Sequence, residues 1–372
     1  MALALSATAR ARRGASRGRR DARRPGPALI DARAATRPEL GGVERWAREL
    51  AARLPALRPG AYTVLAPPPG LVHRAGHAWE QLVLPARAAG ARAAALLCPA
   101  NLAPAAAHRT VLVVHDAAAL RHPGWYTPTY AAWQRVLLPL LVRRAARVIT
   151  VSEFSRAELT DLLGLAPERI TVVSGGVEAR FSPAADPAGA RAALGLARPY
   201  VLCVASQTAR KNLGALAPAA ARLAADGVEV VVAGGHRPQF AREPGLERLR
   251  LLGHVDDALL PGLYAGAEAF VLPSAYEGFG LPVLEAMASG TPVLAARAAA
   301  LPETCGGAAR LVLPTPEAVA DALPALLTDT GERARLRAAG LARAHAFTWE
   351  RTAAGVDAVV AEVAGWPSLP SG

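Results

Sequence analysis

The sequence lacks several features that define common protein classes. Its three cysteines, Cys98, Cys203 and Cys305, are odd in number and widely spaced, which argues against a disulfide framework or a cysteine-rich metal cluster. No apolar run reaches the ~18–20 residues needed to cross a bilayer. A G-x-G-x-x-G fingerprint and a Walker G-x-x-x-x-G-K-[ST] motif are also missing, which argues against a nicotinamide-dependent dehydrogenase and a P-loop nucleotidase. We therefore expect a cytoplasmic protein without a redox cofactor.

Lysine is almost absent. Of the 42 cationic residues, 41 are arginine, and the exception is Lys211. An ammonium group is a compact charge with three rotatable donors, whereas a guanidinium is a planar fork. In a chain so strongly biased towards arginine, the single lysine indicates a position where arginine would not serve, with chance survival as the alternative.

The net positive charge of the chain comes from its first half. Residues 1–182 carry 26 Arg against 12 acidic residues, whereas residues 183–372 carry 16 cationic and 18 acidic residues. This asymmetry indicates an anionic partner for the first half. The basic region lacks a zinc module, a basic zipper and an aromatic RNA-binding signature, so anionic lipid or a lipid-linked acceptor fits better than nucleic acid.

Aromatic residues gather beside arginines in one stretch, Leu120–Val148. This stretch contains Trp125 and Trp133, then a leucine-rich run, then Arg143 and Arg144. Such a pattern suits an interfacial segment that touches anionic lipid at the inner face of a membrane. An ordinary core helix with a solvated face is the alternative reading.

Short apolar runs alternate with helical stretches from about Ala28 onward. Alternating strands and helices predict βαβ units and parallel sheets. The strand candidates form a first set, Thr110–Val114, Arg147–Val151 and Ile170–Val173, and a second set, Tyr200–Val204, Val228–Ala233, Ala269–Leu272, Pro292–Ala296 and Ala309–Leu313. The helical segments include Val43–Leu54, Arg156–Leu163, Leu213–Ala225 and Ala318–Leu327.

This alternation predicts an α/β protein with two doubly wound, Rossmann-like domains whose ligands bind in the cleft between them. Residues 1–28 hold eight Arg and one acid, and we expect them to form a disordered tail. The first domain is expected at 29–182 and the second at 183–345. In residues 346–372 we expect a helix that returns to the first domain, followed by a tail.

The segment 272–292 has the pattern of an anion site. A strand ends at Leu272, a loop with Gly278 and Gly280 follows, and a helix begins with Pro282 at its first position. Glycines allow the backbone to approach a ligand, and a helix N-terminus carries partial positive charge. These features suit a diphosphate. Glu277 in the loop and Glu285 in the first helical turn would face the same cleft and accept hydroxyl hydrogen bonds from sugars.

This segment, EGFGLPVLEAMASGTPV, resembles the E-x7-E element of the retaining glycosyltransferases of family 4, which have the GT-B fold. The resemblance extends upstream to Leu252–Asp257 and Leu263–Ala267, and downstream to Leu301–Glu303 and Gly306–Ala309. It covers nearly everything from about Leu29 to Trp349. It implies an acceptor-binding first domain, a donor-binding second domain and a bacterial mannosyltransferase-like enzyme of polysaccharide biosynthesis.

The resemblance also implies roles for individual residues of the second domain. Glu285 would hold the ribose hydroxyls, Glu277 would hold the transferred sugar, and Lys211 would lie against the diphosphate. Ser206 stands where relatives place an arginine, so the source of the second positive charge stays open, with Arg210 either supplying it or facing solvent. The donor-binding set is completed by the loop and helix start, Gly278, Phe279, Gly280 and Leu281, and by two residues near the base, His254 and Val255.

Two places in the first domain are candidates as well. The loop that contains Gly42 follows a strand, and the resemblance places it near the reacting phosphate or acceptor; a tight turn is the alternative. His115 ends the strand candidate Thr110–Val114, and the resemblance places it over the donor sugar as a third catalytic residue beside Glu277 and Lys211. Asp116 either shares that task or caps the following segment. We assign Ser155 and Glu158 only a structural capping box.

The implied chemistry is transfer of a hexose with retention, from a nucleotide-diphosphate sugar to a glycan or lipid-linked acceptor. Lys211 and the helix start would stabilise charge on the departing diphosphate. The sequence has no D-x-D metal motif, so we expect no essential divalent cation. GDP-mannose is the favoured donor, with UDP-sugars as an alternative. A nucleotide-sugar epimerase or phosphorylase on the same fold, and a non-enzymatic lipid-binding module, stay open.

Overall fold

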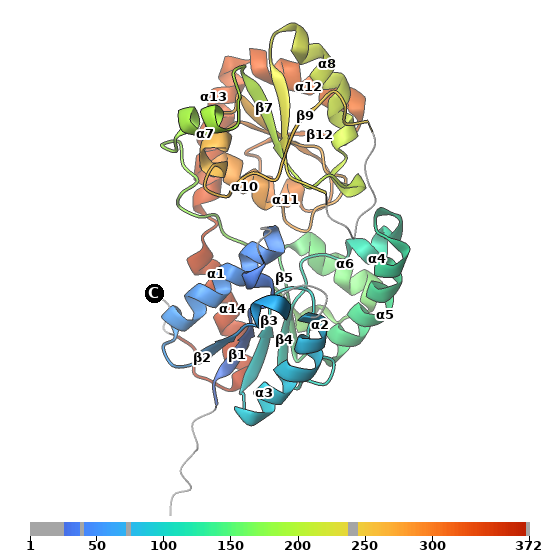
Figure 1. Ribbon diagram of the computed structural model, residues 1–372, viewed down its shortest axis with the longest axis vertical. Coiled ribbons are helices and arrows are strands. Elements are labelled where there is room, and N and C mark those ends of the chain that lie inside the picture. The colour runs from blue at the N-terminus through green and yellow to red at the C-terminus, as the bar shows by residue number, and fades with distance from the viewer. Residues whose placement is uncertain (1–25, 38–40, 72–75, 237–244, 370–372) are drawn as a thin grey trace, which may run out of the picture.

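Two lobes make up the described part of the chain. The computed structural model describes residues 26–37, 41–71, 76–236 and 245–369. Within these ranges each lobe is built around a six-stranded sheet covered by helices (Figure 1). Every strand pair in both sheets is parallel. The predicted fold class, α/β with two doubly wound parallel sheets, is confirmed.

The first sheet has the strand order β2-β1-β3-β4-β5-β6. Three strands of this half, β4, β5 and β6, end one residue earlier than predicted, β1 is the strand expected before the loop that contains Gly42, and β2 and β3 were not expected. The strands are β1 (Ala28–Asp31), β2 (Tyr62–Leu65), β3 (Ala95–Cys98), β4 (Thr110–Val113), β5 (Arg147–Thr150) and β6 (Ile170–Val172).

The second sheet has the strand order β12-β11-β10-β7-β8-β9. Its central strands β7 and β10 have the predicted bounds, β8 and β11 begin one residue later than predicted, and β12 is one residue shorter at each end. The unexpected strand is β9. The strands are β7 (Tyr200–Val204), β8 (Glu229–Ala233), β9 (Arg250–Gly253), β10 (Ala269–Leu272), β11 (Val293–Ala296) and β12 (Arg310–Val312).

Helices connect the strands in both lobes. Those of the first half are α1 (Gly42–Leu57), α2 (Gly76–Ala78), the π-helical η3 (Trp79–Val83), α3 (Leu84–Gly90), α4 (Ala118–Arg121), α5 (Pro128–Arg144) and α6 (Glu153–Leu163). Those of the second half are α7 (Pro187–Ala193), α8 (Ala217–Ala225), α9 (Leu260–Ala265), α10 (Leu281–Ala288), α11 (Leu301–Cys305), α12 (Pro316–Thr328), α13 (Thr330–His345) and α14 (Trp349–Ala364). Short 3-10 turns complete the set: η1 (Ala34–Thr36), η2 (Pro69–Leu71), η4 (Pro123–Trp125), η5 (Pro167–Arg169), η6 (Ala209–Lys211) and η7 (Leu213–Leu216).

The last helix crosses back to the first lobe. Helix α14 packs against α1 and against β3, β4 and β5 of the first sheet. Its buried Asp357 accepts hydrogen bonds from the Arg58 guanidinium and the Tyr62 hydroxyl, both at 2.7 Å. Of the expected tail at 1–28, residues 1–25 lie outside the described residues, and Ala28 is the first residue of β1. None of the helices within the described ranges has the length and apolar character that crossing a bilayer requires.

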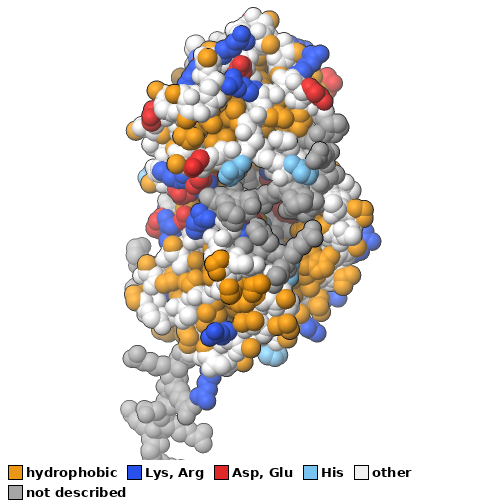
Figure 2. Space-filling view, viewed as in Figure 1, with side chains coloured by type: hydrophobic (Ala, Val, Ile, Leu, Met, Phe, Trp, Pro, Cys, Tyr) orange, Lys and Arg blue, Asp and Glu red, His pale blue; other side chains and the backbone are white. Residues whose placement is uncertain are grey.

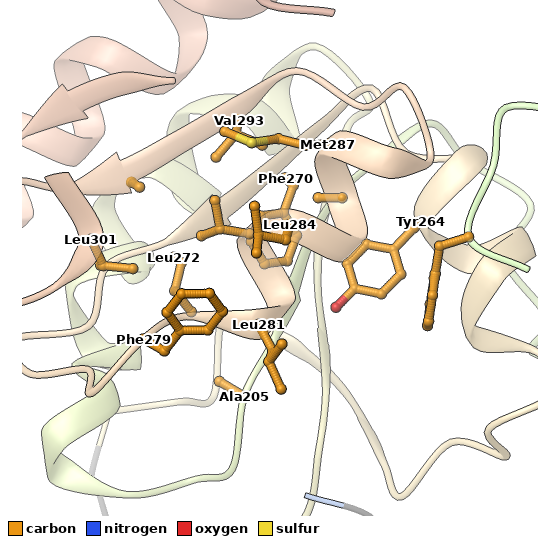
Figure 3. Close-up of a cluster of buried hydrophobic side chains, with 14 of the residues drawn as sticks. Ala205, Tyr264, Phe270, Leu272, Phe279, Leu281, Leu284, Met287, Val293 and Leu301 are labelled. Atoms are coloured by element: carbon orange, nitrogen blue, oxygen red, sulfur yellow. The ribbon is translucent and has the colours of Figure 1, made fainter. Parts of the chain in front are cut away.

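Helix α10 is anchored in the core of the second lobe. Its side chains Leu284 and Met287 lie beside Phe270 of β10 and Val293 of β11 (Figure 3). All four are at most 1% exposed, and burying each such side chain contributes roughly 1.5–3 kcal/mol. The start of α10 is therefore held rigidly at the carboxyl edge of the second sheet.

An ion pair is buried in the first lobe beside the end of β1. The Arg33 Nε donates to Glu80 Oε2 at 2.6 Å, while Arg33 Nη1 and Glu80 Oε1 are buried without a partner. Burial raises the pKa of Glu80 to about 7, against the opposing charge of Arg33. Glu80 lies on the π-helical segment η3, a conformation that often marks functional positions.

The raised pKa of Glu80 predicts a pH-dependent stability. The folded chain retains this proton between about pH 4.5 and pH 7 while the unfolded chain releases it, so stability falls as pH rises through that window. Glu80→Gln should remove this contribution, which is on the order of 3 kcal/mol. Urea unfolding of both proteins at pH 5 and pH 8 measures it. The exposed Glu168→Gln serves as control, and parallel pH dependence of wild type and Glu80→Gln would contradict the assignment.

Candidate active site

Lys211 and Glu277 form a buried ion pair at the carboxyl edge of the second sheet. Lys211 ends the turn η6, which follows β7, and Glu277 lies in the loop between β10 and α10. The Lys211 Nζ contacts Glu277 Oε1, and the Ser274 hydroxyl donates to the same oxygen at 2.8 Å. Both side chains are less than a tenth exposed. The fold thus brings the single lysine into contact with the first glutamate of the E-x7-E element.

The pKa shifts of this pair have opposing causes. Burial lowers the pKa of Lys211 and outweighs the attraction of Glu277. Burial alone would raise the pKa of Glu277, but Lys211 and Arg210 together hold it below its ordinary value. Glu277 is therefore ionised at neutral pH. Its Oε2 accepts no hydrogen bond from any described residue, which leaves that oxygen for a ligand hydroxyl.

Glu285 faces the first lobe from α10. The Tyr264 hydroxyl donates to its Oε2 at 2.8 Å, and the Arg45 Nε of α1 lies 3.6 Å from its Oε1. Arg45 also contacts Glu178 and, at 2.7 Å, Asp257. Burial raises the pKa of Glu285 despite the charge of Arg45. The Glu285 carboxylate, with Arg45 beside one oxygen and Tyr264 on the other, can accept a pair of ligand hydroxyls.

The prediction that Glu285 lies in the first turn of its helix is wrong. Helix α10 begins at Leu281, with Pro282 second, so Glu285 is in the second turn. Gly280 precedes the helix with a φ of 101°, a left-handed conformation that favours glycine. The amide groups of the loop glycines and Phe279 donate no hydrogen bond to another described residue. Together with the helix N-terminus they can receive an anion.

Gly278 lies where the backbones of the two lobes approach closely. A Cβ built on it would lie 2.2 Å from the carbonyl oxygen of His115. Its own carbonyl oxygen accepts hydrogen bonds from the Ser152 hydroxyl at 2.6 Å and the Ser155 hydroxyl at 3.1 Å. The capping box proposed for Ser155 is wrong, because the N-cap of α6 is Ser152 and Ser155 instead binds across the cleft. Only glycine fits at position 278 while the lobes stay together.

Gly278→Ala should therefore weaken the contact between the lobes. The added methyl group would meet a backbone oxygen that cannot rotate away, so we expect a loss of about 1–3 kcal/mol in stability. Turnover should fall by ~10-fold or more, because the site draws residues from both lobes. Thermal unfolding and initial rates measure both effects. Gly124→Ala, whose added Cβ meets nothing within 4 Å, is the matched control; equal behaviour of the two variants would contradict the interpretation.

His115 lies buried at the end of β4, next to this contact. Its Nε2 is 2.8 Å from the Pro99 carbonyl oxygen, and its ring packs edge-on against Trp46 with centroids 5.4 Å apart. Burial lowers the pKa of His115, so the ring is neutral at neutral pH. Since a carbonyl can only accept, the proton is assigned to Nε2, which leaves Nδ1 as an acceptor.

Arg210 crosses the cleft instead of facing solvent. Its Nη1 donates to Asp116 Oδ2 at 3.1 Å, and its side chain is 16% exposed. The other oxygen of Asp116 accepts from the Ala118 amide at 3.1 Å, so Asp116 both caps the following segment and holds Arg210. Arg210 also lowers the pKa of Glu277, although its effect is smaller than that of Lys211. A second positive charge therefore lies close to the Lys211 pair, although Ser206 carries none.

The remaining candidate residues lie around the same edge. Gly42 is the first residue of α1, and a Cβ on it would be 3.5 Å from the Leu281 side chain. The Phe279 carbonyl accepts from the Thr304 hydroxyl at 2.6 Å. Two candidates contribute no side-chain hydrogen bond to the site within the described residues: Ser206, which is half-buried after β7, and His254, which is exposed after β9 beside buried Val255.

Three contributors were missed from the sequence. Arg45, Tyr264 and Ser152 contact Glu285 or Gly278, yet the sequence interpretation gave none of them a binding role. Arg45 stands three residues after Gly42, one helical turn on, and that spacing was the available signal. Within the described ranges, no three His, Cys, Asp or Glu side chains are grouped so that they could hold a metal ion.

Comparison with family models matches both halves of the chain. Residues 40–181 match the model described as Glycosyltransferase Family 4, and residues 198–329 match Glycosyl transferases group 1. The solved structures of sucrose-phosphate synthase from Thermosynechococcus elongatus (TM-score 0.72, 20% identity) and of Anabaena Alr3699/HepE in complex with UDP and glucose (0.66, 19%) share the fold. They cover 91% and 90% of this chain, and the chain covers 99% of each.

Curated relatives are similar over about two thirds of the chain. O-antigen chain mannosyltransferase B of Escherichia coli is 32% identical over 65% of this chain and 67% of its own length. The MMP α-(1→4)-mannosyltransferase of Mycolicibacterium hassiacum is 33% identical over 63% of this chain, and D-inositol 3-phosphate glycosyltransferase of Nocardia farcinica is 37% identical over 58%. The matched region spans only 59% and 52% of these two relatives.

Proposed function

Because the chain belongs to glycosyltransferase family 4, we propose that it transfers a hexose, with retention, from a nucleotide-diphosphate sugar to a glycan or lipid-linked acceptor. The observation that carries this proposal is the contact of Lys211 with Glu277 beside the start of α10, with Glu285 on the same helix. A cation and a helix N-terminus suit a diphosphate, and two buried carboxylates suit sugar hydroxyls.

In the proposed ground state, Glu285 accepts hydrogen bonds from the ribose diol. The Oε2 of Glu277 accepts one from the transferred sugar, and the amides of Gly278 to Gly280 donate to the phosphates. His115 presents Nδ1 as a further acceptor for a sugar hydroxyl. This assignment uses the ionised carboxylate of Glu277 and the neutral ring of His115, the protonation states that their surroundings favour.

In the proposed reaction, the bond between the anomeric carbon and the phosphate oxygen breaks while the acceptor oxygen bonds to the same face of the sugar. The acceptor proton passes to the departing phosphate oxygen. Negative charge grows on the diphosphate, and the Lys211 ammonium and the start of α10 stabilise it in a largely desolvated cleft. This arrangement needs no divalent cation for the leaving group.

GDP-mannose is the donor we favour, since two of the curated relatives are named as mannosyltransferases. UDP-sugars are the second candidate, since a structure of similar fold was solved with UDP and glucose. Titration calorimetry with GDP, UDP and ADP measures which of the three nucleoside diphosphates binds most tightly. We expect one diphosphate to bind with micromolar Kd, and millimolar binding by all three would contradict the donor site.

Product analysis tests the transfer itself. The chain is incubated with GDP-, UDP- and ADP-sugars and a membrane extract, and products are followed by mass spectrometry and their anomeric configuration by NMR. We expect a product only when acceptor is present, with the donor's configuration kept. Conversion of a donor incubated alone would favour an epimerase, and inverted configuration would contradict retention.

A further inference from the structure

The first lobe leaves a concentrated group of large apolar side chains exposed. Of the ten large apolar side chains exposed among the described residues, five come from only two elements, η3 and α5. Leu82 is 72% and Val136 74% exposed, the two highest fractions among these ten side chains. We call this group the α5–η3 surface, and it consists of Leu82, Val83, Trp133, Val136 and Leu140.

The two elements lie side by side. The His77 ring, just before η3, packs against the Trp133 ring of α5 with centroids 5.5 Å apart. The Gln81 side chain of η3 makes two hydrogen bonds, both 2.9 Å long, with the loop between β3 and β4. Its Nε2 donates to the Ala103 carbonyl, and its Oε1 accepts from the Ala105 amide. Arg144, at the end of α5, donates to the Ala105 carbonyl of that same loop at 2.8 Å. Figure 2 shows hydrophobic side chains gathered over the first lobe, on the face where Figure 1 places α2 and α3. The two elements are therefore linked through the His77–Trp133 contact and through their shared loop.

Helix α5 turns an apolar stripe outward. Trp133, Val136 and Leu140 follow the spacing of one helical face, and the helix ends in exposed Arg143 and Arg144. A helix of a water-soluble lobe ordinarily turns polar residues outward. The inner face of α5 already packs in the core through Leu138, Leu141 and Val142. The outer apolar stripe is therefore not needed to hold α5 on the lobe.

The charge around the α5–η3 surface has one sign. Residues 76–152, all described, contain eight arginines and two acidic residues. Glu80 is fully buried on Arg33, and Asp116 is held by Arg210, so neither presents a free negative charge. Exposed arginines lie on α5 itself, at positions 135, 143 and 144, and on α3, which follows η3, at position 87.

We propose that the α5–η3 surface docks on a bilayer that contains anionic lipid. The apolar side chains enter the headgroup boundary, and the flanking arginines bind the lipid phosphates. The charge favours this occupant over a second copy of the chain, because the exposed arginines on α5 and α3 would repel the same arginines of a second copy. The proposal depends only on this surface, not on the proposed transfer chemistry.

Docking of the α5–η3 surface would also place the cleft between the lobes close to the bilayer. Helix α5 carries Tyr130 and Gln134, which line a small cavity together with Asn101 and Asp116. Asp116 in turn holds Arg210 of the second lobe. The helix that contacts lipid on its outer face therefore borders the candidate site on its inner face, and an acceptor anchored in the bilayer would arrive beside it.

Vesicle co-sedimentation of the full chain tests this surface. We expect binding to phosphatidylcholine vesicles containing 30% phosphatidylglycerol, no binding to pure phosphatidylcholine, and loss of binding at high salt. Leu82→Asp/Val136→Asp should weaken binding ~10-fold or more. Arg135→Ala/Arg143→Ala, which removes two side chains without hydrogen bonds to described residues, should weaken it roughly 20- to 30-fold. The arginines before Gly26 are present in every variant, so they cannot cause these differences.

Matched controls lie on the second lobe. Leu313→Asp changes another exposed leucine, and Arg198→Ala/Arg335→Ala removes two other exposed arginines; both should bind as wild type does. Nucleotide affinity of the Leu82→Asp/Val136→Asp variant should stay unchanged, which separates this proposal from the donor site. Unchanged vesicle binding of both test variants would overturn the proposal. A dimer seen by light scattering that Leu82→Asp/Val136→Asp dissociates would overturn it in favour of self-association.

Discussion

Replacing Lys211 by methionine should lower kcat by ~10²-fold or more while the KM for the donor changes much less. Methionine keeps most of the side-chain length but removes the charge that stabilises the departing diphosphate. Lys211→Arg should also fail, because a planar guanidinium does not fit where the ammonium is 9% exposed against Glu277. Initial-rate kinetics with a saturating acceptor measure the effect.

The loss of activity in Lys211→Met must be distinguished from the effect of misfolding. Removing Lys211 leaves the Glu277 carboxylate buried without its partner, which costs about 3–5 kcal/mol in stability. Lys211→Met/Glu277→Gln removes both charges and should recover most of the thermal stability without recovering activity. A double variant that regained wild-type turnover would assign Lys211 a structural role alone.

Glu285→Gln should weaken binding of the nucleoside diphosphate about 10- to 100-fold. A carboxylate that accepts two ribose hydroxyls makes charge-assisted hydrogen bonds worth about 1.5–3 kcal/mol, which an amide oxygen does not match. The Arg45 guanidinium at 3.6 Å would also lose its counter-charge. Titration calorimetry measures the loss. Glu317→Gln, an exposed glutamate in the first turn of α12, is the control and should bind as wild type does.

We also expect nucleotide affinity to depend on pH in the wild type but not in Glu285→Gln. Burial raises the pKa of Glu285, so the carboxylate becomes protonated at a higher pH than an exposed glutamate would. Only the ionised form accepts both hydroxyls, so nucleotide affinity should fall as pH decreases towards that raised pKa. In Glu285→Gln the affinity should be flat over the same range. Identical pH profiles of wild type and variant would show that another group controls binding.

Periodicity predicted the fold class well, and local composition explains the misses. Strands such as β7 and β10 are short apolar runs, the first beginning after Pro199 and the second lying between Glu268 and Pro273, and their bounds matched the prediction. Strand β3 lies inside an alanine-rich stretch, where helix propensity conceals a strand. Strand β9 begins with Arg250 and leaves Leu251 41% exposed, so it lacks the apolar signal of a buried strand.

The site was predictable only within contiguous motifs. Glu277, Glu285 and the loop between them could be identified because they are close in sequence. Lys211 could be identified because it is the single lysine of the chain, but its contact with Glu277 is visible only in the structure. The contacts from Arg45 and Ser152 cross 240 and 126 positions, and no local pattern encodes a pairing between lobes.

The central claim is that the cleft beside α10 holds a nucleoside diphosphate with its phosphates on Lys211 and its ribose on Glu285. A crystal structure of the chain with the nucleoside diphosphate that binds most tightly tests it most directly. We predict diphosphate density within hydrogen-bond distance of Lys211 Nζ and the amides of Gly278 to Gly280, with both ribose hydroxyls on the Glu285 carboxylate. Nucleotide density elsewhere, with these side chains uninvolved, would contradict the claim.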